Sequence, residues 1–590
     1  EKGRLLAQSA AVERLLNAFI RETGVVRITV PNDSLAHLRL PSAMRRTIEE
    51  QGLPLQVGLP LTGAVLYGSL AYPSAFGHHR YGTDFWVARD GGEPEELTTV
   101  LEMADLLLNE IALHDPDVSR REHRVRIMRA NIENSLDKSL IYVAHGLEEQ
   151  ESLWSLDGET RMIAAEQRLF YGHPFHPTPK SSAGWSTDDL ARYAPELGAS
   201  FRLRYWAADP QLVREFLPDG GDEVLFGADV LEAAEGLLGR GRETFRLLPL
   251  HPWQAAHLLS WPLVEELMAQ GKLVDLAYLG GPVMPTSSVR TVWDSRHRIS
   301  YKLPLDVRIT NFIRVNPFDQ LERTADAVRV LDHLAPQTAQ PGFSIIPERG
   351  YRTLWLEEET PEMQEQVAAN FGVIFRESPE LEQAPTVVAA LLEQPPYAQE
   401  MPIGEAVRIA ARREGQAADE RFLKKWLGQY LQISLVPLFR LFVTHGVSME
   451  AHVQNSMVAL EQGWPVQFFV RDLEGVSVSR DHAPAFLARN SEVLYDDWEA
   501  WERLKYYFFV NHLGHLIHAL AYSGSCREEA LWDAVAELLQ SFEDSPYLRD
   551  LFENPGLPAK ANLISSFQHR GEKPSYVSIP NPLYKGKVQA

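Results

Sequence analysis

The sequence is poor in cysteine, short of positive charge and free of long uninterrupted apolar runs. Its 590 residues contain one cysteine, Cys526, so a single chain cannot build a disulfide framework, a cysteine-based zinc site or a cysteine-ligated iron–sulfur cluster. This cysteine usage fits a reducing cytoplasm, where we expect the protein to act.

Negative charge dominates, because 57 Lys and Arg stand against 80 Asp and Glu and give a net charge of −23. An acidic chain of this size is a poor partner for nucleic acid or anionic lipid, so we expect neither. Small anionic molecules can still bind if basic residues gather in one pocket.

The longest apolar stretch, LGQYLQISLVPLFRLFV, is interrupted by Pro437 and Arg440. It falls short of the roughly 18 uninterrupted apolar residues of a spanning helix, so it predicts a buried helix and no membrane partner. The N-terminus shows no signal-peptide pattern. Val12, Leu15 and Phe19 recur there at helical spacing and predict an amphipathic helix.

Composition is that of a globular protein, and the length suggests roughly three or four domains' worth of chain. Helical patterns and short strand-like runs are mixed throughout, which predicts an α+β fold. GHHRYGTDFWVARDGG, 77–92, predicts a hairpin with a glycine-rich turn. The proline-containing segment 395–404 is the best candidate for a linker. We divide the chain into 1–150, 151–400 and 401–590.

Polar side chains alternate with apolar ones in MEAHVQNSMVAL, residues 449–460. Glu450, His452 and Gln454 recur at every second position, which predicts a strand with one polar face, and Asn455 follows directly. Polar groups in an apolar setting cost free energy unless a partner satisfies them. The stretch therefore predicts a binding face.

HPFHPTPK brings His173, His176 and Lys180 together in a proline-rich segment. Two histidines three residues apart could bind zinc from a helix, but the prolines do not permit a helix there. A rigid loop that presents His and Lys as hydrogen-bond donors suits an anion better.

PTSSVRTVW, 285–293, gathers the donors Ser288, Arg290 and Thr291. The guanidinium group can bind two oxygens of a phosphate or a carboxylate. The alternative is an ordinary polar strand edge.

Basic residues also lie within YKLPLDVRITNFIRVNP, 301–317. Lys302 stands at the start of a strand-like run, and Thr310, Asn311 and Arg314 follow among apolar residues. Basic groups in an apolar run need an anionic partner, so the segment predicts an anion pocket within an acidic protein.

WPVQFFVRDLEG places Asp472 at the end of an apolar run, 22 residues after Glu450. A connection this short predicts a hairpin that brings the two carboxylates together. Paired carboxylates and an amide oxygen suit Mg²⁺ beside phosphates. A solvated turn is the alternative for each acid alone.

These segments together predict nucleotide chemistry without a P-loop, since no GxxxxGK[ST] motif is present. Protein kinases use an analogous strand lysine with Asp and Asn around magnesium. A small-molecule kinase is therefore one hypothesis from the residues alone.

The chain resembles a known family in the motifs HPFHPTPKSSAG, LPLHPWQ, TSSVRTVW, KLPLDVRITNFIRVNP, MEAHVQN and RDLEG. They are similar to those of the siderophore synthetases that work independently of nonribosomal peptide synthetases, the aerobactin- and achromobactin-synthetase-like family. The resemblance is close over about 170–475 and looser up to the C-terminus. ITNFIRVNP resembles the branch that uses free citrate.

The resemblance implies an ATP- and Mg²⁺-dependent ligase that adenylates a carboxylate of citrate and then forms an amide or ester with an amine or hydroxyl. AMP and pyrophosphate are the by-products. It also implies a cupped-hand α+β fold with mixed and antiparallel sheets and a helical C-terminal region. The thumb would be 1–150, the fingers 151–400 and the palm 401–590, frequently in a homodimer.

The resemblance assigns roles to matching positions. The nucleotide would contact His173, His176, Ser288, Arg290, Thr291, Lys302, Gln454 and Asn455. Mg²⁺ would be held by Glu450, Asn455 and Asp472. Citrate would contact Thr310, Arg314, His452 and Lys560, with Arg314, His452 and Lys302 closest to the chemistry.

Two questions stay open at the level of sequence. A ferric-siderophore-binding accessory protein is a non-enzymatic alternative, and the stripe His512, His515 and His518 could suggest iron, although its spacing favours structural roles. Neither the amine nor the base that deprotonates it can be identified.

Overall fold

The computed structural model describes residues 1–590 except 26, 29–39, 149, 311, 571–573 and 587–590. Helices and strands are mixed along the whole chain, and the described strands form six sheets, which confirms the α+β class. No helix within the described ranges has both the length and the apolar character that a membrane crossing requires.

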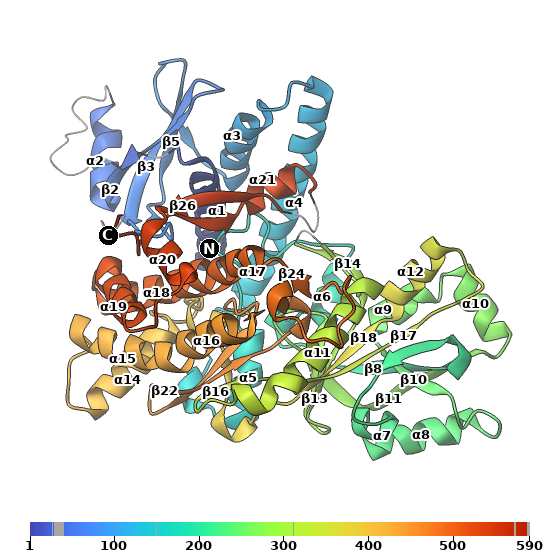
Figure 1. Cartoon of the computed structure of the whole chain (residues 1–590). Coiled ribbons are helices and arrows are strands. Elements are labelled where there is room, and N and C mark those ends of the chain that lie inside the picture. The colour runs from blue at the N-terminus through green and yellow to red at the C-terminus, as the bar shows by residue number, and fades with distance from the viewer. Residues whose placement is uncertain (26, 29–39, 149, 311, 571–573, 587–590) are drawn as a thin grey trace.

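The N-terminal region is an antiparallel sheet covered by helices (Figure 1). Leu15, Leu16 and Phe19 on one face of α1 are buried in its core, which confirms the predicted amphipathic helix. The predicted hairpin at 77–92 is present only in part. Its glycine-rich turn connects β5 to β6, which lies beyond 92, whereas β4 pairs with β3. The helices are α1 (Lys2–Thr23), α2 (Ser42–Gln51), α3 (Val100–Ala112) and α4 (Val118–His145), and the strands are β1 (Arg27–Ile28), β2 (Leu53–Leu59), β3 (Ala64–Tyr72), β4 (Arg80–Tyr81), β5 (Phe85–Arg89) and β6 (Glu95–Leu97).

An eight-stranded antiparallel sheet, in the order β10-β8-β11-β12-β13-β18-β17-β9, dominates the middle of the chain. Apolar clusters pack on it, together with α8 (Ala228–Leu238), α9 (Pro252–Leu258) and α12 (Pro361–Phe371). Lys302 ends its strand rather than starting one, which corrects the sequence prediction. The strands are β8 (Phe201–Ala208), β9 (Val213–Phe216), β10 (Arg246–Leu250), β11 (Leu273–Pro285), β12 (Thr291–Asp294), β13 (Ile299–Lys302), β17 (Glu348–Leu354) and β18 (Val373–Glu377).

The residues that follow Lys302 form a small antiparallel sheet in the order β15-β14-β7. It joins the segment around 182 to the segment around 310. Its strands are β7 (Ser182–Ala183), β14 (Leu305–Ile309) and β15 (Phe312–Arg314), and α11 (Phe318–Thr338) comes next.

The C-terminal region packs helices on a mixed sheet of order β16-β22-β21-β19, in which β16 runs parallel to β22. The predicted hairpin before Asp472 is confirmed, since β21 and β22 pair antiparallel. The long apolar run forms two buried helices, α15 and α16. The elements are β16 (Phe343–Ile345), β19 (Thr386–Val387), β21 (Ser456–Glu461), β22 (Trp464–Val470), α15 (Glu420–Ile433), α16 (Leu435–His445), the π-helical Lys505–Leu513, α18 (Gly514–Gly524) and α19 (Glu528–Gln540).

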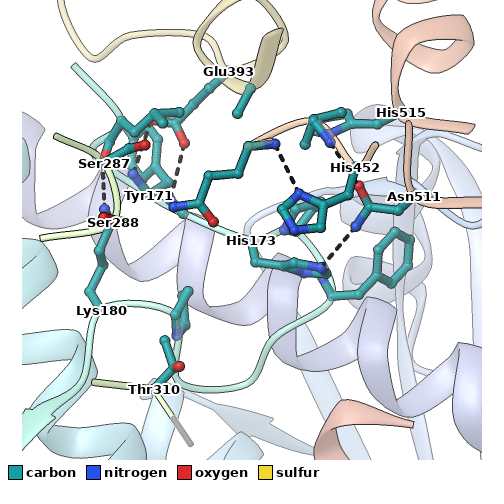
Figure 2. Close-up of a pocket in the computed structure, with 18 of the residues that line it drawn as sticks. Tyr171, His173, Lys180, Ser287, Ser288, Thr310, Glu393, His452, Asn511 and His515 are labelled. Atoms are coloured by element: carbon teal, nitrogen blue, oxygen red, sulfur yellow. Dashed lines mark hydrogen bonds between the residues drawn. The ribbon is translucent and has the colours of Figure 1, made fainter. Parts of the chain in front are cut away.

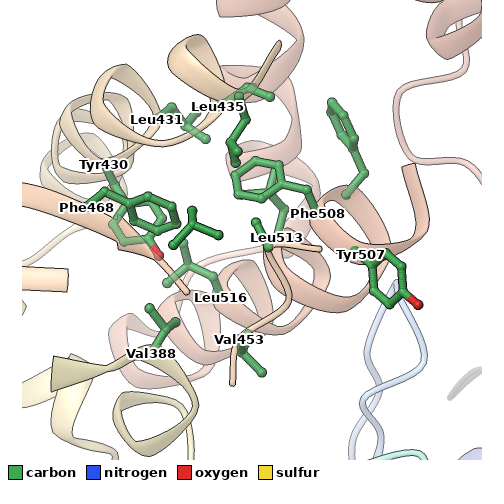
Figure 3. Packing of buried hydrophobic residues seen from close by; sticks show 14 of the residues in the cluster. Val388, Tyr430, Leu431, Leu435, Val453, Phe468, Tyr507, Phe508, Leu513 and Leu516 are labelled. Carbon is green, nitrogen blue, oxygen red and sulfur yellow. The ribbon is translucent and has the colours of Figure 1, made fainter. Parts of the chain in front are cut away.

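The core of this region contains Tyr430, Phe468, Phe508 and Leu516, which pack against one another (Figure 3). Val453 enters the same cluster from the loop that precedes β21. The segment predicted as a linker also belongs here, because Met401 is buried and α14 (Pro402–Arg413) packs in the core. The division at 150 and 400 remains a prediction.

The segment that contains α21 (Asn562–Phe567), near the end of the chain, packs against α1 (Figure 1). The carboxylate of Glu22 on α1 accepts the backbone N–H groups of Leu563 and Ile564 at the start of α21, at 2.8 and 2.7 Å. Asn562 donates to the carbonyl of Phe175 at 3.2 Å. These contacts close the N-terminal region over a cavity that the other two regions also line.

Candidate active site

A cavity of about 1000 Å³ lies where the three regions meet, and its lining comes from segments far apart in the chain. Figure 2 shows part of it, with His173, His452 and Asn511 side by side. Of the site residues predicted from the sequence, only His176 is absent from the lining. Asn311 lies outside the described residues. The predicted lining residues are His173, Ser288, Arg290, Thr291, Lys302, Thr310, Arg314, Glu450, His452, Gln454, Asn455, Asp472 and Lys560.

The predicted strand at 449–455 is wrong, because this segment is a loop between β20 (Val447–Ser448) and β21. Its turn is closed by His452, whose Nδ1 accepts the backbone N–H groups of Gln454 and Asn455 at 3.2 Å each. The alternation still holds for burial: Met449 and Val453 are buried, whereas His452 and Gln454 reach the cavity. The pattern therefore identified the facing side chains but not the secondary structure.

A charge cluster joins the large sheet to the loop after β22. Lys302 Nζ lies 2.7 Å from Asp472 Oδ1 and 2.5 Å from Glu474 Oε2. Arg376 on β18 contacts Asp472 at 3.5 Å and Glu348 at 2.9 Å. Burial alone would raise the pKa of Asp472, but the two cations outweigh it and hold the pKa below its ordinary value. Asp472 is thus ionised at neutral pH.

Two arginines share a second part of the cavity. Arg290 Nη1 donates to the carbonyl of Arg314 at 3.1 Å and to Asn316 Oδ1 at 2.6 Å, while Arg314 Nη2 donates to Thr310 Oγ1 at 3.0 Å. Arg314 Nε is buried and has no hydrogen-bond partner among the described residues. Burial first, and repulsion from Arg290 second, lower the pKa of Arg314 to about 10. An anion bound here would offset both costs.

Among the described residues of the cavity wall, three other than glycine have positive φ: Val289 at 69°, Thr310 at 59° and Asp472 at 74°. β-Branched side chains avoid this region of backbone conformation. Each such residue costs on the order of 1–3 kcal/mol and persists only where its surroundings enforce it. Backbone strain of this kind at residues that line a cavity is frequent at functional sites.

The HPFHP segment is a turn rather than a helix, as its prolines predicted. His173 reaches the cavity, and its Nε2 lies 3.4 Å from Asn511 Nδ2. His176 is buried, and its Nδ1 accepts the N–H of Thr178. Lys180 is not a free anion donor, because Nζ pairs with Glu196 at 2.6 Å. Within the described residues, no group of three or more His, Cys, Asp or Glu side chains could hold a metal by itself.

The π-helical segment supplies another wall. Lys560 Nζ contacts the hydroxyl of Tyr507 at 2.9 Å, and the ring of Tyr507 lies 5.8 Å from that of His452. Burial lowers the pKa of His452, so its imidazole is neutral. π-Helical turns occur frequently at functional sites. His512 on this segment is structural, since it bonds Tyr430 Oη and the carbonyl of Ala451.

Sequence reasoning missed several charged residues of the lining, namely Arg21, Arg323, Arg376 and Arg503. Arg376 could have been recognised from the sequence, because it interrupts the apolar strand VIFRE. The others lie on helices whose charged residues look like ordinary solvent-facing ones. Their contribution arises only from long-range packing.

The LPLHPWQ motif lies outside the cavity lining and is structural. His251 is fully buried and caps α9, where its Nδ1 accepts the N–H of Trp253 at 3.1 Å. Burial lowers its pKa to about 3.

Comparison with known proteins places these motifs in a family context. The sequence profile of the IucA/IucC family matches residues 161–393, and that of FhuF-like ferric iron reductase transporters matches 424–575. The lone Cys526 does not allow a cysteine-ligated cluster within the second match.

Full-length relatives are similar over nearly the whole chain. The L-2,3-diaminopropanoate–citrate ligase of Staphylococcus aureus is 34% identical, covering 98% of this chain and 97% of the relative. The spermidine–citrate ligase of Bacillus anthracis is 28% identical, covering 98% of each. The ATP-bound aerobactin synthetase IucA of Klebsiella pneumoniae has a TM-score of 0.79 at 23% identity, over 98% of this chain and 100% of that one.

We predict that the buried His251 makes the free energy of unfolding decrease as the pH falls. The unfolded histidine takes up a proton below pH ~6.5 and the folded one only near pH 3, so its contribution to the free energy of unfolding is complete above pH ~6.5. It is lost as pH falls, by up to about 1.4 kcal/mol per pH unit. His251→Asn keeps a capping acceptor and should flatten the slope between pH 6 and 4 in denaturant titrations. The exposed His114→Asn is the control, and an unchanged slope in His251→Asn contradicts the assignment.

Proposed function

The chain belongs to the IucA/IucC family, the siderophore synthetases that act independently of nonribosomal peptide synthetases, and from that premise we propose that it ligates citrate to an amine or hydroxyl at the expense of ATP. The observation that carries the proposal is the Arg314 guanidinium, buried in the cavity with an unpartnered Nε and a second arginine beside it. Such a pair calls for a multiply charged anion.

The triphosphate is proposed to lie against Ser288, Arg290, Thr291 and Lys302. Cationic groups fixed in a partly buried cavity reduce the repulsion between a triphosphate and a carboxylate, and they stabilise the charge that develops on pyrophosphate. Gln454 and His173 would contact the same nucleotide from the facing loops, and His176 would act only through the loop that it stabilises.

Mg²⁺ is proposed to bind Asp472, Glu450 and Asn455. This ion usually keeps several waters and takes phosphates beside one or two carboxylates, so it does not need a cage of protein ligands. The donors fit that requirement, since Lys302 bonds Oδ1 of Asp472 and no described residue donates a hydrogen bond to Oδ2. When bound, Mg²⁺ would neutralise charge on the departing pyrophosphate.

Citrate is proposed to be held by Arg314, Thr310, His452 and Lys560. One citrate carboxylate forms a bond to the α-phosphorus of ATP, and the bond to pyrophosphate breaks. The amine nitrogen or hydroxyl oxygen then attacks the acyl carbon, AMP leaves, and the nucleophile loses one proton. His452 orients the carboxylate, which is already ionised at neutral pH and needs no base.

The homodimer, the cytoplasmic location and the thumb, fingers and palm boundaries are also proposals, supported by the family membership. A kinase with the same Lys, Asn and Asp types remains the competing reaction, and a ferric-siderophore-binding accessory protein the non-enzymatic one. Analysis of the nucleotide products distinguishes the ligase, the kinase and the non-enzymatic accessory protein.

The proposal predicts citrate- and Mg²⁺-dependent formation of AMP and pyrophosphate, together with a hydroxamate when hydroxylamine intercepts the activated citrate. Nucleotides are resolved by chromatography and hydroxamate by its iron complex. ADP as the product would identify a kinase, and siderophore binding without any turnover would identify an accessory protein. Full activity in excess EDTA would show that the reaction does not need Mg²⁺.

Arg314→Ala is expected to impair citrate use more than ATP binding. A charge-assisted hydrogen bond to a carboxylate contributes about 1.5–3 kcal/mol, which corresponds to roughly 10- to 100-fold in kcat/KM for citrate. Hydroxamate kinetics give the citrate parameter, and calorimetry gives the ATP Kd. The exposed Arg413→Ala on α14 is the control. A weakened ATP Kd with unchanged citrate dependence would reassign Arg314 to the nucleotide.

A further inference from the structure

The cavity extends beyond the proposed ATP and citrate positions to a wall formed by α1 and β4. Arg14, Asn17 and Arg21 lie on one face of α1, three to seven residues apart, and Arg80 on β4 joins them in the lining. The cavity of about 1000 Å³ is at the upper end of the range for ligand pockets, and this wall contains none of the residues proposed above to contact ATP or citrate.

None of these three arginines forms an ion pair with a described residue; instead they contact carbonyl, amide or hydroxyl oxygens. Arg14 donates hydrogen bonds from Nε and Nη2 to the carbonyl of Gly172 and from Nη1 to the carbonyl of Ala10. Arg80 donates to Tyr522 Oη at 3.3 Å, and its buried Nε has no partner among the described residues. The guanidinium groups of this wall are therefore not paired directly with a carboxylate of a described residue.

Arg21 has the most unused hydrogen-bonding capacity. Its single hydrogen bond to a described residue runs from Nη2 to the carbonyl of Phe76 at 2.9 Å, so Nε and Nη1 remain for a ligand. Its guanidinium carbon lies 3.1 Å from the ring centroid of Phe175. Burial lowers its pKa to about 9, a cost that an anionic ligand would offset.

Three histidines of this part of the cavity, His78, His173 and His515, do not add charge. His78 stacks between His515 and His518, with ring centroids 4.9 and 5.0 Å apart. Burial holds the pKa values of His78, His173 and His515 well below their ordinary value, so their imidazoles are neutral. The positive charge of this wall therefore comes from its arginines and not from these three histidines.

Two carboxylates, Glu13 and Glu393, also line this part of the cavity. Glu393 accepts the N–H groups of Tyr171 and Gly172 at 3.0 Å each. A wall that carries unpaired guanidinium groups with carboxylates nearby suits a zwitterion. A diamine or polyamine would bring only positive charge to it, and like charges a few ångströms apart repel.

We propose that Arg21 binds the carboxylate of the nucleophile, so that the chain condenses citrate with an amino acid rather than with a polyamine. This inference rests on the proposed function and adds the class of its second substrate. Arg14 and Arg80 strengthen the field around that carboxylate, and the amino group that attacks points towards the activated citrate.

The test uses matched amines that differ only in a carboxylate: L-2,3-diaminopropanoate against ethane-1,2-diamine, L-ornithine against putrescine, and L-lysine against cadaverine. Each pair is compared by kcat/KM for citryl-amide formation. Both members intercept the same activated citrate, so their ratio is independent of the rate of activation. Hydroxamate formation without any amine reports activation separately.

Wild type should prefer the carboxylate-bearing member of its best pair by at least about 10-fold. Arg21→Gln should reduce that ratio to within about 3-fold, and Arg21→Lys should restore part of it because the charge returns. Arg4→Gln, an exposed position on the same helix, should keep the wild-type ratio.

Three outcomes overturn the inference: a wild-type enzyme that uses the decarboxylated amines equally well or better, an Arg21→Gln variant that keeps the preference, or hydroxamate formation with no amino acid accepted. Absence of citrate-dependent hydroxamate would instead contradict the proposed function. Arg21→Gln that raises the ATP Kd at an unchanged amine ratio would assign Arg21 to the nucleotide.

Discussion

The ion pair between the buried Lys302 and the half-buried Asp472 fixes the geometry of the cavity. Lys302 ends β13 of the eight-stranded sheet, and Asp472 follows β22 of the four-stranded mixed sheet, so the pair joins two sheets that share no strand. Glu474 and Arg376 complete the cluster. A protein of net charge −23 thereby keeps basic residues in one place, where burial makes each charge effective.

Residues around the cluster have backbone conformations that are unfavourable for residues other than glycine. Thr310 and Val289 hold positive φ near Arg314 and Arg290, and Asp472 holds it at the ion pair itself. Backbone hydrogen bonds hold two of these positions: the N–H of Thr310 donates to the carbonyl of Ser181 at 3.0 Å, and that of Val289 to the carbonyl of Thr286 at 2.8 Å. Groups positioned in this way need little rearrangement when a charged substrate binds, which is the condition for electrostatic stabilisation of a transition state.

Local patterns predicted much of this arrangement. The α+β class, the helix α1 and the β21–β22 hairpin followed from periodicity, and the alternation at 449–455 identified the side chains that face the cavity. The strand assignment there failed because alternating burial does not require a strand partner, and His452 closes a turn instead. Arg21 could not be found, since its role depends on packing between α1 and segments hundreds of residues away.

Our central proposal is that the charge cluster, besides joining the two sheets, binds nucleotide and magnesium. Calorimetric binding of ATP to Asp472→Asn, with and without Mg²⁺, tests it most directly, because asparagine tolerates positive φ and Lys302 keeps Glu474 as a partner. The account predicts a folded variant in which Mg²⁺ no longer strengthens ATP binding, whereas the exposed Asp481→Asn retains the wild-type gain. An Asp472→Asn protein with the full Mg²⁺-dependent gain would contradict the account.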